Sequence, residues 1–175
     1  GNGTQTIQIA NACGIGGLTS VTLQNTIYQQ EVSQLCASQL PLSECQGGNL
    51  PGVYMHQWQG IVTLPATCTE WTFSYSSCCR NTSNNLSSGS SQNYYWESTL
   101  NNAAAPCNNS PVITAQPIPY TCINQAVIYN FGVLEPDGNT LVYSLVPAMT
   151  SATGTTPYAG GASGAAPLAG ITINP

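Results

Sequence analysis

The chain has 175 residues with one basic and six acidic side chains, and its formal net charge at pH 7 is −5. Charged residues make up only 4% of it, so Ser, Thr, Asn and Gln must provide most of its polar surface. Lys and Arg supply most of the affinity for phosphate backbones and for anionic lipid headgroups. A chain whose single cation is Arg80 is therefore not expected to bind nucleic acid or an anionic membrane surface.

The cysteines indicate an oxidising compartment. Their number is even, no two have the CxxC spacing of a zinc site, and the only histidine, His56, is near none of them in sequence. Disulfides are the better interpretation, and they predict a secreted protein at the cell surface. No apolar run of 18 residues occurs, so we expect no direct membrane insertion, a signal peptide already removed and any anchor elsewhere. The expected disulfide cysteines are Cys13, Cys36, Cys45, Cys68, Cys78, Cys79, Cys107 and Cys122.

Short β-rich runs alternate with clusters of Gly, Pro, Asn and Ser, which is typical of all-β proteins. No window of a dozen residues has clean helical periodicity, and we expect only a short helical turn at 33–40. Long exposed loops are expected at 81–93 and 151–170. The expected strands are 5–10, 21–26, 52–64, 70–77, 94–100, 112–115, 126–133 and 141–147, with another beginning at 171–173.

Aromatic residues alternate with small polar ones in two of these runs. Trp71, Phe73 and Tyr75 must share one face of a strand, and we expect that face to be packed in the core, with an exposed aromatic platform for sugar as the alternative. Tyr94 and Trp96 share a face in the same way. Together with Trp58, these two form the alternative candidate site, an exposed aromatic surface for sugar.

The second half of the chain has a hairpin pattern. Apolar residues occupy every second position of 127–131 and of 141–145, on either side of Pro136-Asp137-Gly138-Asn139, a turn sequence in which Gly supplies the positive φ. Prolines at 106 and 111 suggest a domain junction. We therefore expect two disulfide-stapled, immunoglobulin-like β-sandwich modules in tandem. Residues 1–107 form the first, and residues 108–175 form the second, which lacks strands at its C-terminal end.

Strand length restricts how the cysteines can pair. Ten residues of strand span roughly 33 Å, whereas a disulfide needs Cα atoms within about 7 Å, so Cys68 should not reach Cys78 or Cys79. Adjacent cysteines rarely bond each other. If Cys107 pairs with Cys122, the consistent solution is Cys13–Cys68, with Cys36 and Cys45 each bonded to one of Cys78 and Cys79.

Candidate catalytic groups are few. A Ser-His-Asp or Cys-His site would have to use His56, which we expect to be structural. Glu70 and Glu97 each adjoin a tryptophan and are the only suggestive carboxylate pair for glycoside hydrolysis. An enzyme is the least favoured class, and we expect no catalytic residue.

One turn concentrates the hard oxygen ligands that calcium prefers. It contains Glu135, Asp137 and Asn139, without the spacing of an EF-hand loop. The same residues also make an ordinary hairpin turn that needs no metal. Calcium is therefore the only cofactor that we consider, and this turn is where we expect it to bind.

Two stretches resemble a known class of proteins. Residues 68–75 and the following Cys78-Cys79-Arg80-Asn81 resemble a segment of large secreted surface proteins of gliding-type Bacteroidetes, which often end in a gliding-motility or type IX secretion sorting domain. Residues 106–112 extend the resemblance, and residues 135–145 are similar to cadherin-like and related immunoglobulin-like repeats. The resemblance covers most of residues 30–150 and implies a surface-attached β-sandwich in a longer adhesin-like polypeptide.

These observations predict a non-catalytic structural or adhesive module of a bacterial surface adhesin or filament. The expected partners are other copies of the chain, neighbouring repeats of a longer protein and glycans. Residues 4–9 could be donated as a strand to a neighbouring subunit. A carbohydrate-binding module is the alternative function.

Overall fold

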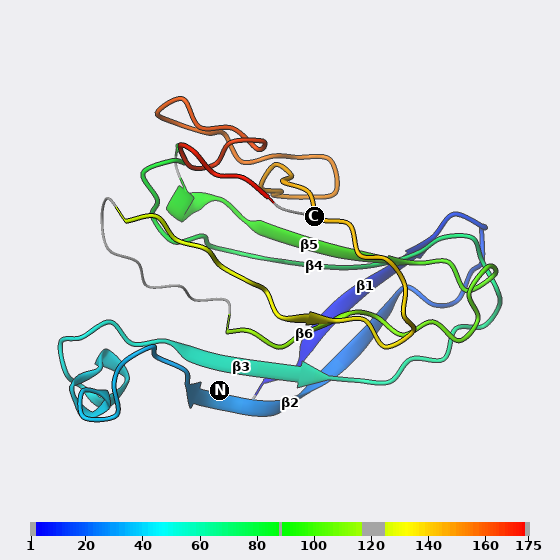
Figure 1. Ribbon diagram of the computed structural model, residues 1–175. Helices are drawn as coiled ribbons and strands as arrows, with labels where there is room; N and C mark the ends of the chain where they lie inside the picture. Colours follow the sequence, from blue (N-terminus) through cyan, green and yellow to red (C-terminus); the bar gives the residue numbers. More distant parts are fainter. Residues whose placement is uncertain (1–2, 88, 117–124, 174–175) are drawn as a thin grey trace. The chain divides into compact units, whose positions relative to one another are not determined.

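Strands and turns make up the fold (Figure 1). The computed structural model describes residues 3–87, 89–116 and 125–173. Within these ranges there is no α-helix, and helical structure is limited to three single 3-10 turns. The all-β class predicted from the sequence is thereby confirmed. The elements are β1 (Gln5–Asn11), β2 (Ser20–Glu31), η1 (Leu40–Leu42), η2 (Glu44–Gln46), β3 (Tyr54–Gln59), β4 (Trp71–Ser77), η3 (Gly89–Ser91), β5 (Tyr94–Leu100), β6 (Val112–Ile113) and β7 (Val133–Leu134).

Five strands form a sheet in the order β3-β2-β1-β4-β5. The pairs β1–β4, β2–β3 and β4–β5 are antiparallel. Trp71 at the start of β4 lies opposite Asn11 of β1 on one side and opposite Leu100 of β5 on the other. This order places β3 and β5 at the two edges of the sheet, while β1 has a neighbour on each side.

Three strands match their predicted ranges to within one residue, namely β1, β4 and β5. The run predicted at 21–26 extends over 20–31, and the run predicted at 52–64 is limited to 54–59. Gly60 follows the end of β3, where a Cβ atom would lie 2.8 Å from Cδ2 of Leu23. The helical turn expected at 33–40 lies later, at η1, where Pro41 occupies a first-turn position that needs no N–H donor.

The expected hairpin between 126–133 and 141–147 does not form. Val112 instead pairs with Leu134, and Ile113 with Val133. Backbone hydrogen bonds from Thr114 N to Gly132 O and from Ala115 N to Phe131 O continue this pairing. Residues 141–147 form no strand, and neither do residues 171–173. The turn itself is present, with Gly138 at φ 73°, so the local turn signal was right and the strand partner was wrong.

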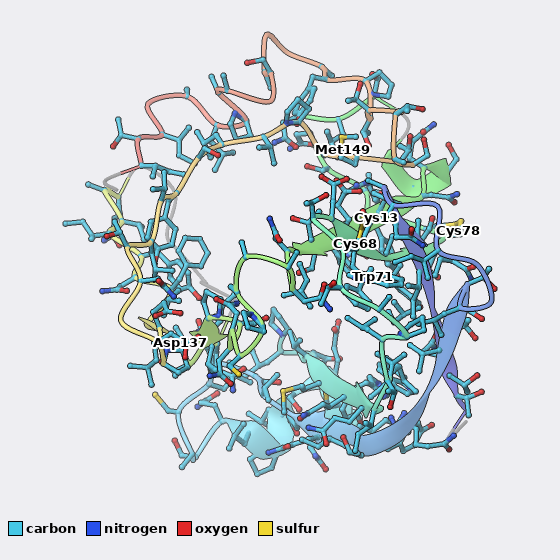
Figure 2. All side chains as sticks on the ribbon, turned by 90° about the vertical axis from the view of Figure 1, so that its right-hand side faces the viewer. Cys13, Cys68, Trp71, Cys78, Asp137 and Met149 are labelled. Carbon is cyan, nitrogen blue, oxygen red and sulfur yellow. A yellow bond between two sulfur atoms is a disulfide. The ribbon has the colours of Figure 1, made fainter. Side chains whose placement is uncertain are left out.

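The buried core is small and lies at one end of β4 (Figure 2). Trp71 is 0% exposed, Cys68 2% and Ile9 5%. Seven partly buried apolar residues pack against these three, which are Ile15, Leu18, Val21, Val62, Leu64, Phe73 and Leu100. Trp71 is the largest fully buried side chain among the described residues, so the rest of the core is arranged around it.

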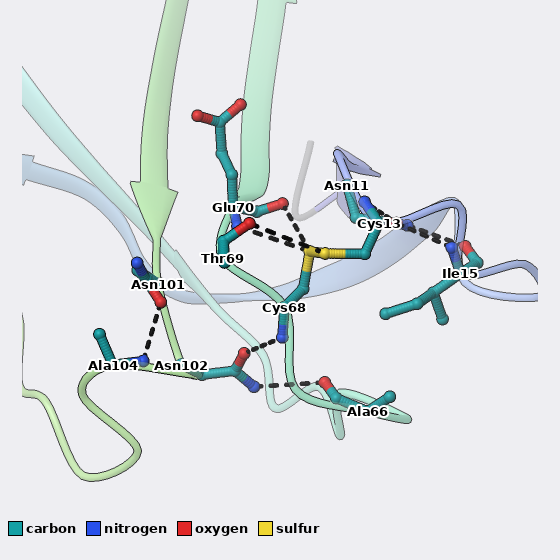
Figure 3. The surroundings of a disulfide bond; sticks show 10 residues. All are labelled: Asn11, Cys13, Ile15, Ala66, Cys68, Thr69, Glu70, Asn101, Asn102 and Ala104. Atoms are coloured by element: carbon teal, nitrogen blue, oxygen red, sulfur yellow. Dashed lines mark hydrogen bonds between the residues drawn. A yellow bond between two sulfur atoms is a disulfide. The ribbon is translucent and has the colours of Figure 1, made fainter.

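A disulfide joins the two loops beside this core (Figure 3). Cys13 follows β1, Cys68 precedes β4, and their Cα atoms are 5.9 Å apart. Asn102 fixes the second cysteine, because its Oδ1 accepts from Cys68 N at 2.7 Å and its Nδ2 donates to Ala66 O. Asn11 Oδ1 accepts from Cys13 N on the opposite side. The predicted Cys13–Cys68 pair is therefore present.

The other predicted bridges differ from the structure. Cys78 and Cys79 bond each other, so the expectation that adjacent cysteines stay apart is wrong here. Cys36 and Cys45 carry no disulfide and lie in the loop between β2 and β3. Cys107 carries no disulfide, and the expected pairing with Cys122 lies outside the described residues.

The chain divides into two compact units that are not contiguous in sequence. One comprises residues 1–5, 22–61 and 109–139, and the other comprises residues 6–21, 62–108 and 140–175. The second unit contains the core, the Cys13–Cys68 bridge, and strands β4 and β5. The division into modules 1–107 and 108–175 stays a prediction.

Candidate functional site

Three aromatic rings gather at the end of β4 and β5 that is away from the core. Tyr75 lies opposite Trp96, and Tyr94 lies opposite Ser77 in the next pair on the same face. The ring centroids of Tyr75 and Trp96 are 6.0 Å apart at an interplanar angle of 13°, and those of Tyr94 and Trp96 are 4.6 Å apart at 35°. We call Tyr75, Tyr94 and Trp96 the aromatic cluster.

The aromatic cluster is open to solvent on one side. Trp96 is 63% exposed, whereas Trp71 on the same face of the same strand pair is fully buried. Tyr75 and Tyr94 are half-buried. The expectation that Trp71, Phe73 and Tyr75 all pack in the core is therefore only partly right, because the core ends before Tyr75.

The opposite face of β5 carries a carboxylate. Strand alternation places Tyr95 and Glu97 there, and Tyr95 Oη donates to Glu97 Oε2 at 2.8 Å. Burial and this hydrogen bond raise the pKa of the Tyr95 hydroxyl. The carboxylate is thus directed away from the aromatic cluster.

Arg80, the only cation in the sequence, binds backbone carbonyl groups. Its Nε donates to Asn93 O at 3.0 Å and its Nη2 donates to Met149 O at 2.5 Å. Its own backbone N–H donates to Gln92 O. The guanidinium therefore closes the loop at 81–93 against the segment around Met149, a role that the sequence did not suggest.

Trp58, the third predicted sugar-binding residue, belongs to a different ring group on β2 and β3. Its indole stacks on His56 at 5.6 Å, and His56 meets the edge of Tyr28 at 5.2 Å. Trp58 Nε1 donates to Gly3 O at 2.9 Å. The structure thus brings Tyr94 and Trp96 together with Tyr75, which the sequence assigned to the core face, and it does not bring Trp58 to them.

In the proposed calcium turn, the carboxylates accept hydrogen bonds from amide N–H groups of the chain. Asp137 accepts from Asn109 N at 2.6 Å and from Asn109 Nδ2 at 2.8 Å. These two bonds hold the pKa of the Asp137 carboxyl below its usual value. Glu135 Oε2 accepts from Asn139 N at 2.6 Å. No group of three or more His, Cys, Asp or Glu side chains is placed to hold a metal in the described ranges, and calcium binding stays a prediction.

The candidate carboxylate pair is far apart along the strands. Glu97 lies opposite Ser74, four residues after Glu70, which corresponds to about 13 Å at the usual rise of a strand. Glycosidases place their two carboxylates about 5–9.5 Å apart. The geometry of this pair therefore offers no support for hydrolysis.

No protein-family model, curated protein or solved structure matches this chain. None of the helices in the described ranges has the length and apolarity needed to span a membrane. What the aromatic cluster offers chemically is an uncharged stacking surface whose Tyr hydroxyls and indole N–H can also form hydrogen bonds.

Proposed function

We propose that this chain is a non-catalytic, extracellular module of a bacterial surface adhesin or surface filament. The observation that carries this proposal is the aromatic cluster, because Trp96 at 63% exposure is a large apolar surface that its own chain leaves uncovered. Exposed aromatic side chains with a polar surround are typical of interaction sites.

The compartment and the finer architecture belong to the same proposal. A disulfide at Cys13–Cys68 and an almost uncharged polar surface suit a secreted protein. The pairing of β6 with β7 supports a second β module, which we propose to be an immunoglobulin-like sandwich in tandem with the first. The resemblance of residues 68–81 to secreted surface proteins of Bacteroidetes is consistent with this assignment.

Assembly by strand addition is proposed for an edge of the sheet. Edge strands usually carry charges or prolines that prevent pairing with another chain. The two edges here, β3 and β5, contain no proline, and Glu97 is the only acidic or basic residue apart from His56. Residues 5–9 lie in β1 between β2 and β4, so their donation would require them to leave two neighbours. The backbone N–H of Tyr95 in β5 already donates to Met149 O, so addition at β3 is the favoured route.

Carbohydrate binding is the second candidate function. The specific observation in its favour is the near-parallel orientation of Tyr75 and Trp96, at 13°. Tyr75 is stacked against Trp96 and limits its movement, while Trp96 remains 63% exposed and offers a ring on which a sugar can stack.

Retention of beads under flow tests the adhesive function. Microspheres coated with the oxidised protein are passed over walls that carry the same protein, extracellular polymer from a bacterial biofilm, or albumin. We expect several-fold greater retention on one of the first two walls than on albumin. Retention at the albumin level on every wall would contradict the proposal.

A further inference from the structure

The face of β4 and β5 that carries the aromatic cluster has no charged side chain. Its members, taken as opposing pairs, are Trp71 and Leu100, Phe73 and Ser98, Tyr75 and Trp96, and Ser77 and Tyr94. The pair of Trp71 and Leu100 lies in the core, whereas the last two pairs lie at the solvent-exposed end of the strands. A ligand at the exposed end would therefore meet rings, hydroxyl groups and no ion.

The rings of the aromatic cluster support one another. Each of the three centroids lies within 6.3 Å of the other two, so each ring limits the movement of its neighbours. Tyr and Trp also have few rotatable bonds. Binding on this surface consequently loses little side-chain entropy, which is the main cost of ordering an exposed site.

The charges nearby are already engaged by the protein. Glu97 is on the other face, where it accepts from Tyr95. The Arg80 guanidinium is committed to the carbonyl groups of Asn93 and Met149. No lysine exists in the sequence. Sulfate, phosphate and uronate groups would therefore find no cation here, and an uncharged ligand is favoured.

We propose that the aromatic cluster binds an uncharged polysaccharide, with the C–H face of a sugar ring stacked on the exposed part of Trp96, which the rings of Tyr75 and Tyr94 hold in place. The C–H groups on the face of a pyranose are weakly positive and complement the negative face of an aromatic ring. The Tyr94 hydroxyl and the Trp96 indole N–H can supply hydrogen bonds to the sugar hydroxyls. This inference deepens the proposed adhesive function, on which it rests, and names its ligand class.

Trp58 is not part of this site. Its indole N–H is bonded to Gly3 O, and one of its faces is stacked on His56. Trp58 therefore supports the packing of β2 and β3, and its substitution is not an informative test of sugar binding.

Affinity electrophoresis tests the proposal with defined polysaccharides. Native gels contain hydroxyethyl cellulose, galactomannan, xyloglucan or laminarin as neutral probes, and alginate or polygalacturonate as acidic ones. We expect at least one neutral polysaccharide to retard the protein, with little change between about 50 and about 500 mM NaCl, because no ion pair is involved. We expect the acidic polymers to have no such effect.

The variant Trp96→Ala should weaken this retardation about tenfold or more, in the range found when a stacked aromatic ring is removed. Ile61→Ala is the matched control, since Ile61 is 96% exposed and lies in the loop after β3. It should bind as the unmodified protein does, and thermal unfolding should show that both variants are folded.

Three results would overturn the proposal: no neutral polysaccharide retards the protein, the two variants lose binding equally, or retardation occurs only in acidic gels and disappears with salt. Loss of self-association by Trp96→Ala in sedimentation, without any glycan binding, would assign the cluster to a second copy of the chain. Bead retention that persists while glycan binding fails would leave the adhesive function standing and remove only its proposed ligand.

Discussion

Asp137 accepts hydrogen bonds from two N–H donors of one residue, Asn109, across 28 positions of sequence. Both bonds favour the charged carboxylate, and they lower its pKa from the usual value of 3.8. A carboxyl group whose pKa is lowered in the folded state stabilises the fold at pH values above its usual pKa. This stabilisation is lost as the pH falls through the lowered pKa. The interaction between residues 109 and 137 should therefore persist at neutral pH and disappear in strong acid.

A carbon-detected NMR titration of the Asp137 carboxyl group tests this interaction. We expect a midpoint below 3.8 in the unmodified protein and a return towards 3.8 in Asn109→Ala, since that change removes the side-chain donor. Asn139→Ala is the control, because its side chain faces Glu135 instead. Equal midpoints in the unmodified protein and Asn109→Ala would show that this contact is absent in solution.

The aromatic residues show which features of the structure can be predicted from a residue pattern. Alternation correctly places Trp71, Phe73 and Tyr75 on one face. It does not give the position at which the core ends, because that depends on which loops cover the strand. Trp71 is covered by the loops that the disulfide joins, whereas Tyr75 is beyond them. For this reason the sequence identified Tyr94 and Trp96 as a candidate site and assigned Tyr75 to the core face.

At the level of elements, the Cys13–Cys68 bridge closes a loop of 55 residues that contains β2 and β3. Chain-entropy arguments give such a loop a stabilising effect of about 4 kcal/mol, through the unfolded state. Cys13→Ser should lower the free energy of unfolding by about 2–4 kcal/mol in chemical denaturation. Cys36→Ser is the control and should have little effect, since Cys36 is exposed and carries no disulfide. Unfolding of the two variants at the same denaturant concentration would show that the bridge does not stabilise the fold.

Local strand signals and strand partners differ in how well they can be predicted. The runs at 5–10, 70–77 and 94–100 have β-branched, aromatic and small polar residues bounded by turns, and they form β1, β4 and β5. The apparent hairpin around Asp137 has an equally good local pattern, yet residues 133–134 pair with residues 112–113. Pairing is decided by long-range contacts that a local pattern does not contain.

At the scale of the whole molecule, the near absence of charge is the most informative feature of the sequence. Composition alone argues against nucleic acid and anionic membranes as partners. The structure adds that the single cation is used within the fold. The even number of cysteines likewise predicts disulfides, but it does not give their connectivity, because connectivity depends on the order of the strands in the sheet.

If the Cys13–Cys68 disulfide stabilises this fold in an oxidising compartment, as we propose, disulfide mapping of the native protein detects it directly. Trypsin has one possible site, Arg80, whereas a glutamyl endopeptidase cuts after Glu31, Glu44, Glu70 and Glu97. Protein from its native source is treated with an alkylating reagent before digestion, without reduction. We predict that peptide 1–31 is joined to peptide 45–70 through Cys13 and Cys68, and that peptide 71–97 is not joined to peptide 32–44. Alkylated Cys13 and Cys68 on separate peptides would contradict this proposal.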